Sequence, residues 1–159
     1  MKYIKGEKQN ETEENKMKYV ILVSHGTFAP GLHSVLKMLV GGNRSDVLSA
    51  SMEDGMGADD FIKQFEETIT PVKEGDEIIL LADIIGGSPL TNAMNVLSQK
   101  NLLKTTMVFG GMNLPMALTA AMIKDNVEAD ILRDSIINES RDAITELELN
   151  LEEEVDDEI

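Results

Sequence analysis

Four runs of apolar, largely β-branched residues alternate along the chain with stretches that repeat apolar residues every three or four positions. The first run, YVILV from Tyr19 to Val23, is continuously apolar, as is typical of a strand covered by helices on both faces. The later strands are expected at residues 47–50, 77–82 and 105–109. Helices are expected at residues 32–40, after a turn from Ser24 to Gly31, and at 58–69, 89–98, 114–123 and 129–146. This alternation predicts an α/β fold with a doubly wound, mainly parallel sheet and helices on both faces.

The two ends of the chain depart from this pattern. Residues 1–16 are polar and are expected to form a mobile leader, so the single folded domain is predicted to span 17–151. At its end Leu147, Leu149 and Leu151 alternate with polar residues, which favours an antiparallel edge strand that is exchanged in a dimer. Residues 152–159 form an acidic tail, which we interpret as a solvated end.

Composition narrows the range of functions. The formal net charge of −15 over 159 residues argues against nucleic acid as a partner, because phosphates require a basic surface. The chain has no cysteine, so disulfides and thiolate chemistry are excluded. No apolar run approaches the roughly 20 residues of a membrane helix, and the leader lacks the apolar core of a signal peptide. A cytoplasmic location is therefore expected.

The residues that follow the strands carry the candidate chemistry, because binding sites of open parallel sheets form at the carboxyl ends of the strands. His25 follows the first strand, and Asp83 follows the third. If these two strands are neighbours, the carboxylate can fix the imidazole tautomer and leave the other ring nitrogen as a nucleophile. A structural role at a strand end stays open for His25, and a capping role stays open for Asp83.

Glycines beside these two residues predict an anion site. Gly26 leaves the backbone open next to His25, and Thr27 completes the first loop. In the second loop Gly86 and Gly87 expose amide groups, while Ser88 suits the N-cap of a helix and Pro89 its first turn. Asn113 is expected to cap a further helix.

Other chemistries have little support. His33 lies off the apolar stripe of its helix and is expected to face solvent without a role. No Walker or Rossmann glycine pattern is present, and histidines do not cluster, so neither a nucleotide nor a metal cofactor is expected.

Three segments, YVILVSHGTFAPGL, ILLADIIGGSPLTNA and VFGGMNLPM, together resemble the IIA component of the mannose, fructose and sorbose family of the sugar phosphotransferase system. The resemblance implies a phosphocarrier that takes a phosphoryl group from the carrier protein HPr onto His25 and passes it to a IIB histidine. It further implies that Asp83 orients His25, that Gly86, Gly87 and Ser88 hold the phosphoryl group, and that the protein dimerises through a C-terminal strand. The membrane components IIC and IID would be indirect partners.

Alternative functions remain open at this stage. The same phosphotransfer can serve a regulatory subunit, as in the one that feeds a dihydroxyacetone kinase, although the GGSP segment argues against that subunit. Some tetrapyrrole metal chelatases also begin with an apolar strand that ends in His-Gly, but they need further metal ligands in the cleft. A domain with an interaction role and no chemistry would leave the matched loops unexplained.

Overall fold

The protein is built around one parallel sheet. The computed structural model describes residues 15–149, which contain the strands β1 (Lys18–His25), β2 (Val47–Met52), β3 (Glu77–Ala82) and β4 (Thr106–Phe109). They lie in the order β2-β1-β3-β4, and every neighbouring pair is parallel. The four predicted strands and their parallel arrangement are confirmed.

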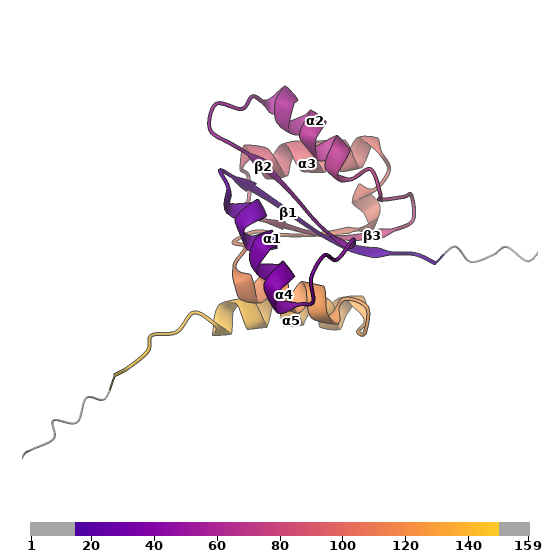
Figure 1. Ribbon diagram of the computed structural model, residues 1–159. Helices are drawn as coiled ribbons and strands as arrows, with labels where there is room; N and C mark the ends of the chain where they lie inside the picture. The colour runs from indigo at the N-terminus through magenta and orange to yellow at the C-terminus, as the bar shows by residue number, and fades with distance from the viewer. Residues whose placement is uncertain (1–14, 150–159) are drawn as a thin grey trace, which may run out of the picture.

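Helices cover both faces of the sheet, as the doubly wound prediction requires. They are α1 (Phe28–Leu39), α2 (Ala58–Thr68), α3 (Ser88–Gln99), α4 (Leu114–Ile123) and α5 (Ala129–Asp142), with a short 3₁₀ turn at Leu103–Thr105 before β4. The helices α1, α4 and α5 lie on one face, and α2 and α3 lie on the other (Figure 1). No helix within residues 15–149 is both long and apolar enough to cross a bilayer.

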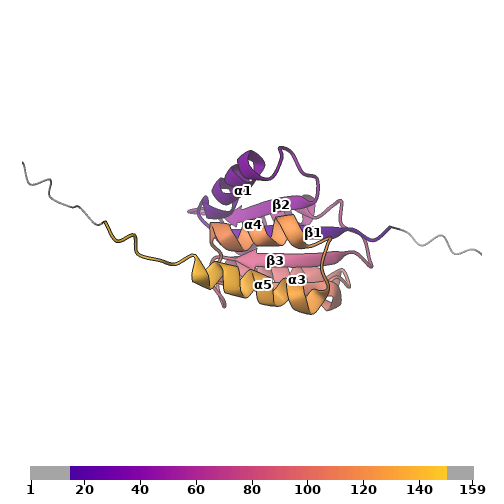
Figure 2. The same ribbon diagram turned by 90° about the horizontal axis from the view of Figure 1, so that it is seen from below.

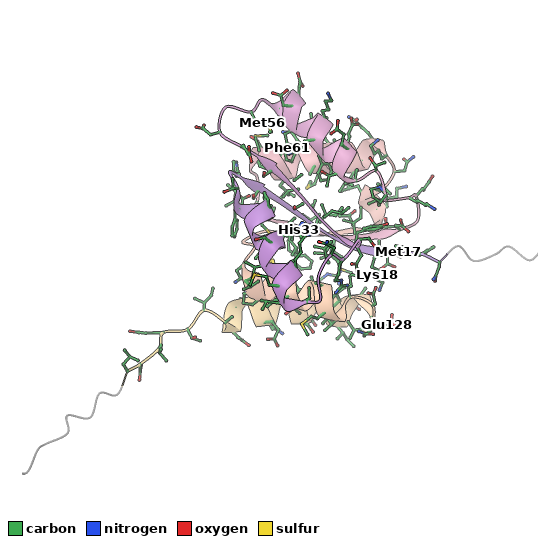
Figure 3. All side chains as sticks on the ribbon, in the orientation of Figure 1. Met17, Lys18, His33, Met56, Phe61 and Glu128 are labelled. Atoms are coloured by element: carbon green, nitrogen blue, oxygen red, sulfur yellow. The ribbon has the colours of Figure 1, made fainter. Side chains whose placement is uncertain are left out.

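The continuous apolar run of β1 serves two cores. Val20 and Leu22 pack in the core formed with α1, α4 and α5, whereas Ile21 and Val23 pack with α2 and α3. Figure 3 labels His33 on α1 and Phe61 on α2, on opposite faces of the sheet. Burial of each large apolar side chain in this way stabilises the fold by about 1.5–3 kcal/mol. Because both faces of β1 are buried, its middle positions are all apolar, and polar residues follow only at its carboxyl end.

Two helix boundaries differ from the prediction by more than one residue. Helix α1 begins at Phe28 instead of after Gly31, because Ser24 Oγ accepts the backbone N–H of Ala29 at 2.7 Å. Pro30 is tolerated in the first turn, where no intrahelical N–H is needed. Helix α5 ends at Asp142, short of the predicted Glu146. The residues from Arg141 to Leu149 are all exposed, so no packing supports further turns.

The segment after α5 leaves the body of the molecule (Figures 1 and 2). Leu147 and Leu149 are 81% and 71% exposed. Residues 147–149 form no strand within this single chain, so exchange of the predicted strand with a second copy stays a prediction. Asn150 and Leu151 lie outside the described residues, as do residues 1–14 of the predicted leader and the tail 152–159.

A network of charges closes the edge of the sheet where the strands begin. Lys124, at the end of α4, is 2% exposed, and its Nζ lies 2.7 Å from Asp46 Oδ2. Arg44 donates from Nε and Nη2 to the same carboxylate at 2.9 and 2.6 Å, and from Nη1 to the carbonyl of Ala121 at 2.8 Å. Asp46 thereby joins the start of β2 to the end of α4. The sequence pattern did not predict this network.

Candidate active site

The pairing of β1 with β3 brings the two candidate residues together. Val23 is the register partner of Ala82, and Asp83 N donates to the carbonyl of Val23 at 3.3 Å. The residues that follow, His25 and Asp83, therefore lie at the same edge of the sheet, as predicted. Their juxtaposition depends on strand order alone, since β1 and β3 are neighbours in space but not in sequence.

Asp83 holds His25 at two points. Its Oδ2 lies 2.8 Å from the imidazole Nδ1 and accepts the backbone N–H of His25 at 2.9 Å. The other oxygen, Oδ1, accepts the backbone N–H of Ile84 at 2.9 Å. Because an ionised carboxylate only accepts hydrogen bonds, the proton of a neutral His25 belongs on Nδ1.

The ionised form of Asp83 is favoured. Its side chain is 17% exposed, and this burial acts to raise the pKa of the carboxyl group. The backbone and side-chain hydrogen bonds from His25, the N–H of Ile84 and the charge of His25 act in the opposite direction and outweigh burial. The net result is a pKa below the usual value of an aspartate, so the group is a lasting hydrogen-bond acceptor near neutral pH.

The free side of the imidazole is accessible. With Nδ1 on Asp83, the ring presents the lone pair of Nε2, and the side chain of His25 is 47% exposed. A neutral imidazole with this tautomer can attack an electrophile through Nε2 while the carboxylate stabilises the positive charge that develops on the ring. The geometry thus fits a nucleophile better than a histidine that only ends a strand.

The first loop is shaped by one glycine. Gly26 has a φ of +54°, which favours glycine, and its N–H donates to the carbonyl of Met52 at 2.9 Å. That amide therefore extends the contact between β1 and β2 and is already engaged. Thr27 is exposed beside His25, and its carbonyl accepts the N–H of Gly31 at 2.9 Å.

The second loop approaches His25 closely at Gly87. A methyl group at this position would lie 2.8 Å from His25 Cε1 and 3.0 Å from Ile84 Cγ1, so only glycine leaves the ring where it stands. Gly87, not the predicted Ser88, is the N-cap of α3, and Ser88 is the first helical residue. The prediction placed the cap one residue too late. Gly87 has the extended backbone of an N-cap residue, and helical geometry begins at Ser88. Gly86, with a φ of +79°, turns the chain into it.

The third loop contacts the second. Gly111 N donates to the carbonyl of Asp83 at 3.1 Å, and Met112 N donates to that of Ala82 at 3.0 Å. Asn113 caps α4, as predicted, by accepting the N–H of Met116 on Oδ1 at 2.9 Å. The segment VFGGMNLPM contributed to the family resemblance, but no contact of Gly111 with Asp83 was predicted from it. The position of Gly111 close behind a strand was the available signal.

His33 does not face solvent freely, contrary to the prediction. It is half-buried on α1, and its Nδ1 lies 2.8 Å from Ser49 Oγ of β2. Burial and the nearby charge of Lys37 lower its pKa. Its partner is a serine and not a carboxylate, so His33 lacks the arrangement that activates His25. Within residues 15–149 no three histidine, aspartate or glutamate side chains gather in a way that could hold a metal ion.

Comparisons of the sequence agree with this site. The family described as "PTS system fructose IIA component" matches residues 19–137, which include both His25 and Asp83. The fructose-specific EIIA component of the phosphotransferase system of Bacillus subtilis is 22% identical over 108 residues, which are 68% of this chain and 71% of that protein.

Comparisons of the structure give the same class. The phosphotransferase system component EIIA of Streptococcus agalactiae superposes with a TM-score of 0.68 at 27% identity, covering 82% of this chain and 97% of the other. The mannose/sorbose-specific IIA subunit of Enterococcus faecalis also gives a TM-score of 0.68 at 27% identity, covering 84% and 96% of the two chains.

Proposed function

The chain belongs to the mannose, fructose and sorbose family of IIA components of the sugar phosphotransferase system and is a phosphocarrier; from this premise we propose that His25 is the residue that carries the phosphoryl group. The hydrogen bond from His25 Nδ1 to Asp83 Oδ2 is the observation that supports this assignment most directly. It leaves one nucleophilic nitrogen on an accessible ring.

In the proposed reaction the lone pair of His25 Nε2 attacks the phosphorus of a phosphohistidine on the donor protein. The new N–P bond forms as the old one breaks, and the donor imidazole leaves with the electron pair of that bond. The Nδ1 proton stays in place, so the phosphorylated ring is cationic and is stabilised by Asp83. The reverse set of bond changes passes the group to an acceptor histidine, and the chain is regenerated.

The loops around His25 contribute positioning and charge. Ser88 and Gly87 open α3, and the first amides of a helix have no partners inside it and attract anions. We propose that Gly86, Gly87 and Ser88 contact the transferred group, with Gly26 and Thr27 bordering it from the other loop. Because positioning and electrostatic stabilisation dominate phosphoryl transfer, these residues need no acid-base chemistry of their own.

We propose HPr as the donor and a IIB component as the acceptor, with the membrane components IIC and IID served indirectly and the exchange taking place in the cytoplasm. Exposed apolar side chains beside the site support protein partners. Phe28 at the start of α1 is 45% exposed, and Ile84 and Ile85 in the second loop are exposed to a greater extent. Apolar residues gathered around a reactive group are typical of a docking surface.

We also propose that the protein forms a homodimer. β4 is an edge strand that pairs with β3 on one side, and three of its four residues are only half-buried. The exposed Leu147 and Leu149 alternate with polar residues as an edge strand does. Pairing of this segment with β4 of a second copy would cover both features.

The chelatase alternative has lost its support. Chelatases need further metal ligands in the cleft, and the other histidine of the chain, His33, is hydrogen-bonded to Ser49 on the face of the sheet that α1 covers. Transport and regulatory output use the same phosphotransfer, and the family assignment favours transport.

Phosphorylation of the purified protein tests the proposal. The protein is incubated with phosphoenolpyruvate, enzyme I and HPr, and its intact mass is measured for the wild type, His25→Ala and His33→Ala. We expect one acid-labile phosphoryl group on the wild type and on His33→Ala, and none on His25→Ala. A folded wild type that takes up no phosphoryl group, or a His25→Ala variant that does, would overturn the assignment.

A further inference from the structure

The loop between β4 and α4, residues 110–113, lies directly against the loop that carries Asp83. Two backbone hydrogen bonds join them, from Gly111 N to Asp83 O at 3.1 Å and from Met112 N to Ala82 O at 3.0 Å. The same aspartate bonds His25 through its side chain. Residues 110–113 are therefore linked to His25 indirectly, with Asp83 as the one residue between them.

Gly110 makes the closest contact between the two loops. A methyl group at Gly110 would lie 2.4 Å from Ile85 Cγ1, 2.6 Å from Ile85 Cδ1 and 3.1 Å from Ile85 N. The φ of Gly110 is not in the left-handed region, so the requirement for glycine here is steric. The side chain of Ile85 is 70% exposed. The contact therefore buries little of the Ile85 side chain. Its main effect is to let Ile85 lie close to the end of β4.

The far end of the 110–113 loop is anchored. Asn113 accepts the N–H of Met116 on Oδ1, and its Nδ2 donates to the carbonyl of Ser140 at 3.0 Å. Ser140 is buried near the end of α5. With α4 and α5 holding this end, a larger side chain at position 110 would displace Ile85 more easily than its own loop.

A displacement of Ile85 would reach His25 by a short path. Ile84 donates its N–H to Asp83 Oδ1, and its side chain lies where it would contact any Cβ on Gly87. Gly87 in turn lies against the imidazole at Cε1. A shift of the Ile85 backbone, whose nitrogen would lie 3.1 Å from the new Cβ, would thus disturb both the carboxylate and the glycine that hold the ring.

We infer that Gly110 is a positioning residue for phosphoryl transfer: by admitting Ile85, it keeps the Asp83–Gly87 loop where Asp83 and Gly87 fix the His25 ring. The effect on transfer rate rests on the proposed function, whereas the effect on the His25 ring does not. Misplacement of reacting groups by about 1 Å can slow a reaction about 100-fold.

The test compares Gly110→Ala with Gly31→Ala. Gly31 is a matched control because it lies on α1, has an ordinary φ and has open space where the methyl group would go. We expect Gly110→Ala to slow phosphorylation by phospho-HPr about 10- to 100-fold and Gly31→Ala to retain the wild-type rate. In ¹⁵N NMR spectra of the unphosphorylated protein, the population of the Nδ1–H tautomer of His25 should fall in Gly110→Ala and stay unchanged in Gly31→Ala.

The Ile85→Ala background isolates the contact. This change removes Cγ1 and Cδ1, the two atoms nearest to a Cβ at position 110, and leaves the 3.1 Å approach of the Ile85 backbone nitrogen. Gly110→Ala should therefore have a much smaller effect in the Ile85→Ala background than in the wild type. If Gly110→Ala alone does not fold, the double variant is compared with Ile85→Ala, and equal transfer rates and equal His25 spectra for these two proteins support the inference.

Two results would overturn the inference. One is a Gly110→Ala protein whose transfer rate and His25 spectrum equal those of Gly31→Ala. The other is an equal effect of Gly110→Ala with and without the Ile85 side chain. A wild type that HPr does not phosphorylate, together with the expected NMR changes, would instead reject the proposed function and leave the positioning role of Gly110 standing.

Discussion

One oxygen of Asp83, Oδ2, accepts both the backbone N–H and the imidazole Nδ1–H of His25, at 2.9 and 2.8 Å. The backbone bond fixes where His25 leaves β1, and the side-chain bond fixes which nitrogen of the ring carries the proton. A single carboxylate thereby sets both the position and the tautomer of His25.

Replacing that carboxylate should slow transfer without removing the nucleophile. Asp83→Asn keeps the size of the side chain but loses the negative charge that stabilises the phosphorylated, cationic ring. We expect the single-turnover rate with phospho-HPr to fall on the order of 10²-fold or more, with phosphorylation still confined to His25. Rapid-quench kinetics measure this, and a rate equal to that of the wild type would contradict the orienting role of Asp83.

Gly87→Ala should displace the His25 ring. The new Cβ would stand 2.8 Å from His25 Cε1, so the imidazole must move, while the φ of −74° at position 87 accommodates alanine. We expect slower phosphorylation and little loss of stability.

A matched control for this change is Gly57→Ala. Gly57 caps α2 with a similarly extended backbone, but its Cβ would meet only Asp60 Oδ2, at 3.6 Å. The two variants should have similar melting temperatures and different transfer rates. Equal rates for the two would show that the approach of Gly87 to the ring has no functional weight.

The network of Arg44, Asp46 and Lys124, at the edge of the sheet where the strands begin, predicts that the protein loses stability in acid. Burial acts to raise the pKa of Asp46, but the hydrogen bonds and charges of Arg44 and Lys124 outweigh it and lower the pKa from 3.8 to about 2. A carboxyl group with a depressed pKa in the folded state stabilises the protein above its unfolded pKa, here by about 2 kcal/mol. This contribution should be lost as the pH falls from about 4 through about 2.

Asp46→Asn measures that contribution. In urea unfolding near neutral pH the free energy of unfolding of the variant should fall by about 2 kcal/mol, because the charge of Asp46 is lost. Lys124, which is 2% exposed, then keeps Asp125 as its charged partner. The difference in unfolding free energy between variant and wild type should narrow as the pH is lowered through the same range. A difference that does not change with pH would mean that Asp46 is not the titrating group.

The proposed dimer can be tested at the exposed leucines. Leu147→Lys with Leu149→Lys should shift the protein from dimer to monomer in sedimentation velocity, because both apolar contacts on one face of the segment are lost. Glu148→Lys, which changes charge on the alternate position, should remain dimeric. A wild type that sediments as a monomer, or a double-lysine variant that remains a dimer, would reject this interface.

Sequence pattern was sufficient to predict the strands of the sheet and to place His25 and Asp83 at the ends of two of them, since both depend on short-range signals. An unbroken apolar run predicts a strand such as β1, and the first polar residues after that run lie at the carboxyl edge of the sheet, where the candidate site is. Pairing of β1 with β3 was only a condition of the prediction, and the structure supplies it. His25 and Asp83 could be predicted because each is next to its strand in sequence.

Contacts between distant segments could not be predicted in this way. The hydrogen bond between His33 and Ser49 depends on how α1 crosses β2, and the ion pair of Lys124 with Asp46 joins residues about half the chain apart. The approach of Ile85 to Gly110 is likewise set by the spacing of β3 and β4. The hydrogen bond from the N–H of Ala29 to Ser24 Oγ at the start of α1 was not predicted for a local reason: the two residues are five apart, beyond the usual N-cap spacing.

The described ends of the chain leave from opposite edges of the sheet. Met17 precedes β1 at the amino edge, whereas the segment after α5 departs near Asn113, at the edge that holds His25 (Figure 1). A fluorophore or surface tether attached ahead of Met17 would therefore leave the reactive face open to solution. One attached after α5 would instead extend from the same edge of the sheet as His25, the edge at which we expect partner proteins to dock.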